Sequence, residues 1–198
     1  MYNYNMKELK TKYPPGDFAV WIIIYIELIT FGLFFIGYIY SRKCDIELFN
    51  ASQLVLDQRF GFVNTIILIT SSFFVVKAVK IIKSINTQDA FNKASKWLIS
   101  AIGLGGIFLI IKMTEFADKF AMGINLSTNK FFMFYFLLTM FHFMHVMLGM
   151  IILFNLYKKT KIGGYTIENH KGFETGAAYW HMVDLLWIVL FPLIYIIR

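Results

Sequence analysis

The sequence contains little cysteine and little charge, and both absences exclude classes of protein. A single cysteine, Cys44, among 198 residues rules out a disulfide framework within the chain and a metal site made of thiolates alone. Charged residues are 16% of the chain, whereas soluble domains usually carry about a quarter. Water is therefore not expected to be the only solvent around this protein.

Several chemical motifs are also missing. The sequence has no glycine-rich phosphate loop, nucleophile elbow, pair of catalytic carboxylates or Cys-x-x-Cys-His haem signal. The net charge of +7 does not indicate nucleic-acid binding, because the basic residues form no stripe with interleaved aromatics. The sequence therefore predicts no active site within this chain and no nucleic-acid partner.

Apolar side chains, by contrast, are abundant. Hydrophobic residues make up 58% of the chain, with 22 Phe and 11 Tyr, and large rings suit both lipid and the bilayer boundary. A helix needs about 20 apolar residues to cross the hydrocarbon of a bilayer, and five stretches are long enough. They predict an all-α integral membrane protein, a single domain over residues 1–198, with spans near 18–40, 60–82, 97–117, 131–157 and 175–197.

Local signals mark the ends of these spans. Pro14 and Pro15 cannot lie inside a helix, which leaves Asp17 as the candidate N-cap of the first span. That span is too long for the core of a cleavable signal peptide, so we expect it to remain in the mature protein. A short amphipathic surface helix is expected between Asp45 and Arg59. Lys and Arg are more numerous on the side of the membrane that holds the N-terminus than on the opposite side. This distribution predicts a cytoplasmic N-terminus and a C-terminus outside.

Ionisable residues inside the spans carry the most information. Each costs about 2.5–3.5 kcal/mol at the centre of an isolated span, so such groups normally face the bundle interior and have partners. Glu27 is expected to be protonated or paired with another helix, in a proton-handling, helix-locking or purely structural role. Lys112 and Glu115 are three residues apart in the third span, which predicts local neutralisation or contact with another helix or subunit.

Histidines mark the last two spans. His142 and His145 share a helix face, but a metal site there would need further ligands, and no Glu-x-x-His pair of the di-iron type is present. Interhelical hydrogen bonding is the preferred interpretation. In the fifth span, Asp184 lies three residues after His181, and a carboxylate beside an imidazole favours the imidazolium or fixes its tautomer. The other polar candidates are Glu174 before the fifth span and Asn64 in the second.

Several segments resemble motifs of subunit III of the haem–copper respiratory oxidases, in the same order along the chain. Residues 169–187, NHKGFETGAAYWHMVDLLW, resemble the family's C-terminal signature. Residues 139–149 look like its Thr-Gly-x-His-x-x-His-Val-x-x-Gly helix, with Met140 in place of the usual Gly. Asn64 and Glu115 match further motif positions, and Glu27 aligns with the carbodiimide-reactive Glu of the family. The resemblance covers residues 14–197.

Three segments are similar to the branch associated with nitric oxide reductase, often called NorE-like. These are residues 15–17, 127–139 and 187–193. Five spans instead of seven agree with that branch, although short five-span forms also occur among true oxidases. Whether the parent complex reduces oxygen or nitric oxide therefore stays open at this point.

The resemblance implies a non-catalytic subunit that packs beside catalytic subunit I of a haem–copper oxidase or a nitric oxide reductase. Haem and copper are expected in that partner and none in this chain, while phospholipid is expected to bind. The implied roles are stability of the complex, support of proton uptake and protection against turnover-linked inactivation. The implied location is a bacterial-type cytoplasmic membrane.

Two rival interpretations come from other classes of protein. A small proton-coupled transporter would use Glu27 and the His pair as a relay, and would transport when purified and placed in liposomes. A metal-dependent membrane enzyme would bind stoichiometric metal at His142, His145 and His181. Discontinuous helices or inverted repeats would favour the transporter, and the sequence shows neither.

Overall fold

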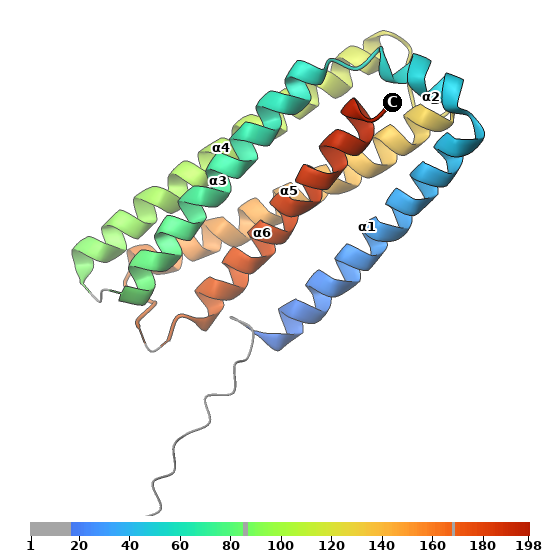
Figure 1. Cartoon of the computed structure of the whole chain (residues 1–198). Helices are drawn as coiled ribbons and strands as arrows, with labels where there is room; N and C mark the ends of the chain where they lie inside the picture. The colour runs from blue at the N-terminus through green and yellow to red at the C-terminus, as the bar shows by residue number, and fades with distance from the viewer. Residues whose placement is uncertain (1–16, 85–86, 168) are drawn as a thin grey trace, which may run out of the picture.

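The computed structural model describes residues 17–84, 87–167 and 169–198, and within these ranges the regular structure is helical. The elements in chain order are α1 (Phe18–Cys44), α2 (Ile46–Gln53), α3 (Gln58–Ser84), α4 (Gln88–Ala121), α5 (Lys130–Lys161), α6 (Lys171–Phe191) and the short π-helix η1 (Pro192–Ile196). Figure 1 shows the long helices running side by side along one axis, with α2 and the C-terminus at the same end of the bundle.

Five of these helices are long and apolar enough to cross a membrane: α1, α3, α4, α5 and α6 continued by η1. The shortest, Lys171–Ile196, has 26 residues, which at 1.5 Å per residue exceeds the roughly 30 Å of bilayer hydrocarbon. The predicted count of five spans is confirmed. The helix that contains the third predicted span, residues 97–117, starts at Gln88, where the Thr87 side chain accepts a hydrogen bond from the Ala90 amide.

Some of the residues predicted to mark helix ends are described by the structure, and others lie outside the described ranges. Asp17 is confirmed as the N-cap of α1, since its Oδ1 accepts a hydrogen bond from the Ala19 amide at 3.1 Å. Pro14 and Pro15, which mark the predicted start of the first span, lie outside the described residues. The short helix expected between Asp45 and Arg59 is present as α2.

The helices α3 and α4 form one antiparallel pair, and α5 and α6 lie between this pair and α1 (Figure 1). The contact between α5 and α6 is close because glycine removes side-chain bulk there. A Cβ on Gly149 would lie 2.8 Å from the Trp180 ring, and one on Gly176 would lie 2.7 Å from Leu156. Small residues of this kind let helix backbones approach each other where no hydrophobic effect drives association.

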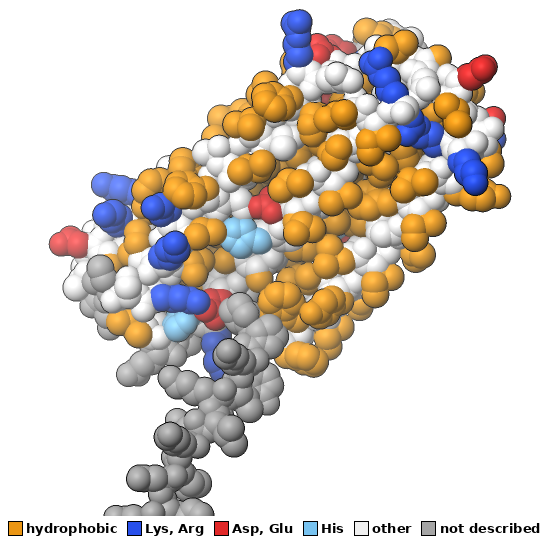
Figure 2. Space-filling view, in the orientation of Figure 1, with side chains coloured by type: hydrophobic (Ala, Val, Ile, Leu, Met, Phe, Trp, Pro, Cys, Tyr) orange, Lys and Arg blue, Asp and Glu red, His pale blue; other side chains and the backbone are white. Residues whose placement is uncertain are grey.

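The surface has the polarity of a membrane protein. Figure 2 shows hydrophobic side chains along the length of the bundle, with Lys and Arg gathered toward its two ends. The helix α1 is the least covered of the spans, and Ile29, Leu33 and Ile36 are each about two-thirds exposed. Apolar side chains in these positions fit lipid, so the chain is a multi-pass membrane protein.

The last turn of the bundle departs from α-helical geometry at Pro192, where the π-helix η1 begins. Backbone carbonyls of that turn are satisfied from elsewhere in the chain. Gln53 Nε2 donates to the Ile194 carbonyl at 2.8 Å, and Gln58 Nε2 donates to the Tyr195 carbonyl at 2.7 Å. These bonds hold the C-terminal turn against α2 and α3 and direct the Tyr195 side chain into the bundle.

Candidate functional site

A cluster of four polar side chains lies in the interior of the bundle, formed by Lys112, Glu115, Tyr135 and Tyr195 and called here the interior cluster. Lys112 Nζ donates to Glu115 Oε2 at 3.0 Å and to the Tyr195 hydroxyl at 2.6 Å. The other carboxylate oxygen, Oε1, accepts from the Tyr135 hydroxyl at 2.7 Å and from the Tyr195 hydroxyl at 2.6 Å. Both oxygens of Glu115 therefore have strong donors.

Aromatic rings surround the Lys112 ammonium, whose side chain has no exposed surface. Nζ lies 5.0–5.5 Å from the ring centroids of Phe116, Tyr135, Trp187 and Tyr195. Cation–π attraction at this range adds about 1–2 kcal/mol per favourable ring when water is excluded. The charge is thus compensated both by Glu115 and by the rings, which explains how a lysine is tolerated in the middle of the bundle.

The interior cluster contains more residues than the pair predicted for the third span. The pairing of Lys112 with Glu115 is present, but the two tyrosines were missed. Tyr135 lies in a Phe-rich run and Tyr195 follows Pro192, and neither position carries a periodic signal that distinguishes it from an ordinary core aromatic. Only the packing of α4, α5 and η1 brings their hydroxyl groups to Glu115.

A second polar site joins α1 to α5. Glu27 Oε2 lies 3.0 Å from His145 Nε2, with the Glu27 side chain 24% exposed and that of His145 9% exposed. His145 Nδ1 lies 2.7 Å from the Phe141 carbonyl, which accepts hydrogen bonds only, so Nδ1 carries a proton. A hydrogen bond between Nε2 and the carboxyl group would then need one further proton, on either Glu27 or His145.

We expect Glu27→Gln to change the free energy of unfolding by less than about 1 kcal/mol, because the amide still donates to His145 Nε2. Glu27→Leu is expected to cost about 1–3 kcal/mol, since it leaves a nearly buried imidazole nitrogen without a partner. Thermal unfolding of both variants in the same detergent measures the difference. Equal stability of the two variants would contradict the pairing.

His142 is not joined to the Glu27–His145 pair by a hydrogen bond within the described residues. Its ring packs edge-on against Phe108 and lies 5.2 Å from the Trp187 ring. Neither ring nitrogen has a hydrogen-bond partner among the described residues, and the same is true of the buried side-chain amide of Asn64. Such atoms generally bind water in a folded protein.

The candidates on α6 contact α3. His181 Nδ1 lies 2.5 Å from Ser72 Oγ and 3.5 Å from Asp184 Oδ2. Glu174 forms an ion pair with Lys83 and lies 3.6 Å from His170 Nε2. The predicted neighbours His181 and Asp184 are therefore together, while Ser72 of α3 supplies the closer contact.

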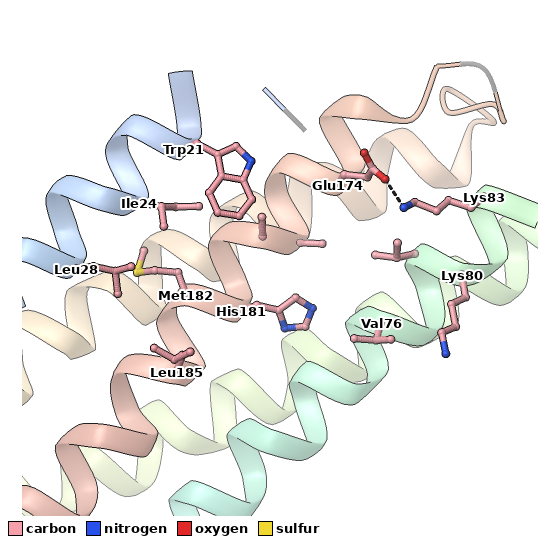
Figure 3. A pocket seen from close by; sticks show the side chains of 13 residues that line it. Trp21, Ile24, Leu28, Val76, Lys80, Lys83, Glu174, His181, Met182 and Leu185 are labelled. Carbon is pink, nitrogen blue, oxygen red and sulfur yellow. Dashed lines mark ion pairs between the residues drawn. The ribbon is translucent and has the colours of Figure 1, made fainter. Parts of the chain in front are cut away.

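The His, Cys, Asp and Glu side chains of residues 17–84, 87–167 and 169–198 form no group of three that could hold a metal ion. A groove of about 560 Å³ lies between α1, α3 and α6 (Figure 3). Its walls are mostly apolar, His181 lies along it, and the Lys83–Glu174 ion pair lies toward one end. The described residues thus form the buried interior cluster, a contact between Glu27 and His145, and a groove between α1, α3 and α6.

The fold and these groups define a five-span membrane protein in which Lys112 pairs with Glu115 and Glu27 with His145. The family model for cytochrome c oxidase subunit III matches residues 18–198. The chain belongs to the cytochrome c oxidase subunit III family.

Individual relatives agree with this assignment. The chain is 38% identical over 136 residues to cytochrome c oxidase subunit 3 of Synechocystis sp., an alignment that covers 68% of this chain and 55% of the relative. It is 32% identical over 193 residues to the probable cytochrome c oxidase subunit 3 of Rickettsia conorii, covering 88% and 65%. The chain thus spans less than two thirds of either protein.

A third relative combines two subunits. The heme-copper oxidase subunit I+III of Aeropyrum pernix is 27% identical over 187 residues, an alignment that covers 90% of this chain and 22% of that protein.

Proposed function

We propose that this chain is the non-catalytic subunit III of a haem–copper terminal oxidase and lies beside its catalytic subunit I in a bacterial-type cytoplasmic membrane. The match to the subunit III family over residues 18–198 carries the proposal. The subunit I+III relative supports the choice of partner, since its name places both subunits in one polypeptide. In this proposal haem and copper belong to subunit I, and phospholipid covers the exposed apolar faces.

Subunit I would be the site of electron transfer, and this chain would stabilise the complex and assist proton uptake. The contact between Glu27 and His145 supports the second role, because a partly exposed carboxyl group with an imidazole partner exchanges protons more readily than a fully enclosed one. The membrane orientation in this proposal has the N-terminus in the cytoplasm, as the distribution of Lys and Arg predicts.

The three segments similar to the NorE-like branch support nitric oxide as the alternative substrate of the parent complex. The relatives reported above carry the name of cytochrome c oxidase or heme-copper oxidase, and for that reason oxygen is the substrate proposed here.

Removal of the chain from the host tests the function. Oxidase assembled without it is expected to retain its haem and its initial rate, but to lose activity over fewer turnovers, and resupply of the chain should restore the lifetime. An oxidase with unchanged stability and lifetime, or a deletion that abolishes only the transport of a solute, would contradict the proposal.

A further inference from the structure

His181 is exposed to the outside of the bundle at a depth where lipid offers no hydrogen bonds. Its side chain is 37% exposed, whereas His145 is 9% exposed and His142 is fully buried. It is the eleventh residue of the 26-residue span Lys171–Ile196, and therefore lies near the middle of the hydrocarbon.

The hydrogen bonds of this site are incomplete. His181 Nδ1 faces Ser72 Oγ at 2.5 Å and Asp184 Oδ2 at 3.5 Å. Nε2 has no partner within residues 17–84, 87–167 and 169–198, and the Asp184 carboxylate has no closer donor in that part of the chain. Polar groups at membrane depth are costly in hydrocarbon and normally face protein or a water-filled cavity.

The surroundings of His181 form a shallow groove suited to a helix. Ile24 and Leu28 of α1 lie on one side, Val76 and Val79 of α3 on the other, and α6 forms the floor (Figure 3). The groove has a volume of about 560 Å³. Apolar walls with a few hydrogen-bonding groups are typical of helix–helix interfaces inside membranes.

We propose that this groove is the docking face for a transmembrane helix of the catalytic subunit, which supplies a hydrogen-bonding side chain to His181 Nε2. The inference rests on the proposed function for the identity of the partner. An acyl chain fills apolar walls equally well but has no donor or acceptor at this depth. A helix provides both, through a Ser, Thr, Asn, Gln, Tyr or Trp side chain.

Site-specific photocrosslinking in membranes that contain the assembled complex tests the docking face. A benzophenone amino acid replaces Leu185 or Val76 in the groove, and Ile110 on the exposed side of α4 serves as the control position. We expect adducts between the two groove positions and a transmembrane helix of the catalytic subunit, and only lipid adducts at Ile110. Lipid adducts at all three positions would contradict the docking face.

A second measurement uses the full complex and a substitution in the groove floor. His181→Leu is expected to weaken association of the chain with the complex about tenfold, the scale of one buried hydrogen bond. Thr114→Val is the control, because Thr114 is exposed on α4 and bonds only its own helix, at the Ile111 carbonyl. If the wild-type chain co-purifies with the oxidase and the His181→Leu variant associates with it equally well, the docking face is contradicted. Failure of the wild-type chain to co-purify would instead contradict the proposed function.

Discussion

Replacing Lys112 by methionine is expected to lower the free energy of unfolding by about 3–5 kcal/mol, the cost of leaving one partner of a buried ion pair uncompensated. Methionine fills the volume of the lysine stem, so the loss is electrostatic. Without the ammonium, Glu115 keeps only the two tyrosine hydroxyl groups as donors. Thermal unfolding of the purified chain in one detergent measures the loss, which should appear as a fall in Tm of about 10 °C.

Two further variants separate the charge effect from other causes. Lys96→Met changes an exposed lysine of the same helix, α4, and is expected to change stability by less than about 0.5 kcal/mol. The double variant Lys112→Met, Glu115→Gln removes both charges, and it should recover most of the loss because a neutral amide still accepts from the tyrosines. A double variant less stable than Lys112→Met alone would show that the ion pair is not the source of the effect.

Trp187→Ala is expected to cost about 3–5 kcal/mol, the range for truncating a large buried aromatic. The ring is fully buried, packs T-shaped on Phe108 at 5.0 Å between centroids, and lies 5.5 Å from Lys112 Nζ. Its Nε1 also donates to Thr65 Oγ1 at 3.0 Å, so one side chain joins α6 to α3, α4 and the interior cluster.

Trp187→Phe keeps a ring in place and loses the bond to Thr65, and we expect a smaller loss, about 1–3 kcal/mol. Phe73→Ala is the control for loss of an aromatic ring, because Phe73 is 51% exposed on α3. The same unfolding assay serves for all three variants. A loss for Phe73→Ala as large as that for Trp187→Ala would show that the assay reports micelle contacts and not the core.

The sequence was sufficient for the spans, the cap at Asp17 and the surface helix α2, because these depend on residues close together in the chain. It was also sufficient to select Glu27 and Lys112 as groups that need partners, since a charge in an apolar span has few alternatives. Helix ends could not be predicted from the spans where a helix continues into polar residues, as α4 does from Gln88 to Trp97. The length of an apolar stretch indicates which residues cross the hydrocarbon, but it does not indicate where the helix ends.

Partners across helices could not be assigned from the sequence. Tyr195 is 80 residues from Glu115 and His181 is 109 residues from Ser72, and their meeting depends on how each helix is rotated about its axis. In a water-soluble bundle an amphipathic stripe reports that rotation. In a membrane both faces of a helix are apolar, so the amphipathic stripe is weak. The sequence pattern therefore does not distinguish Tyr135 from the neighbouring phenylalanines.

The measurement that bears most directly on the whole account is purification of the chain from its native membranes in a mild detergent, with a reduced-minus-oxidised optical spectrum of the bound material. We expect haem bands and copper in the complex, and both should remain with the partner when this chain is dissociated and isolated. A chain that purifies alone, without any haem protein, or that retains haem after separation, would contradict its assignment as a non-catalytic oxidase subunit.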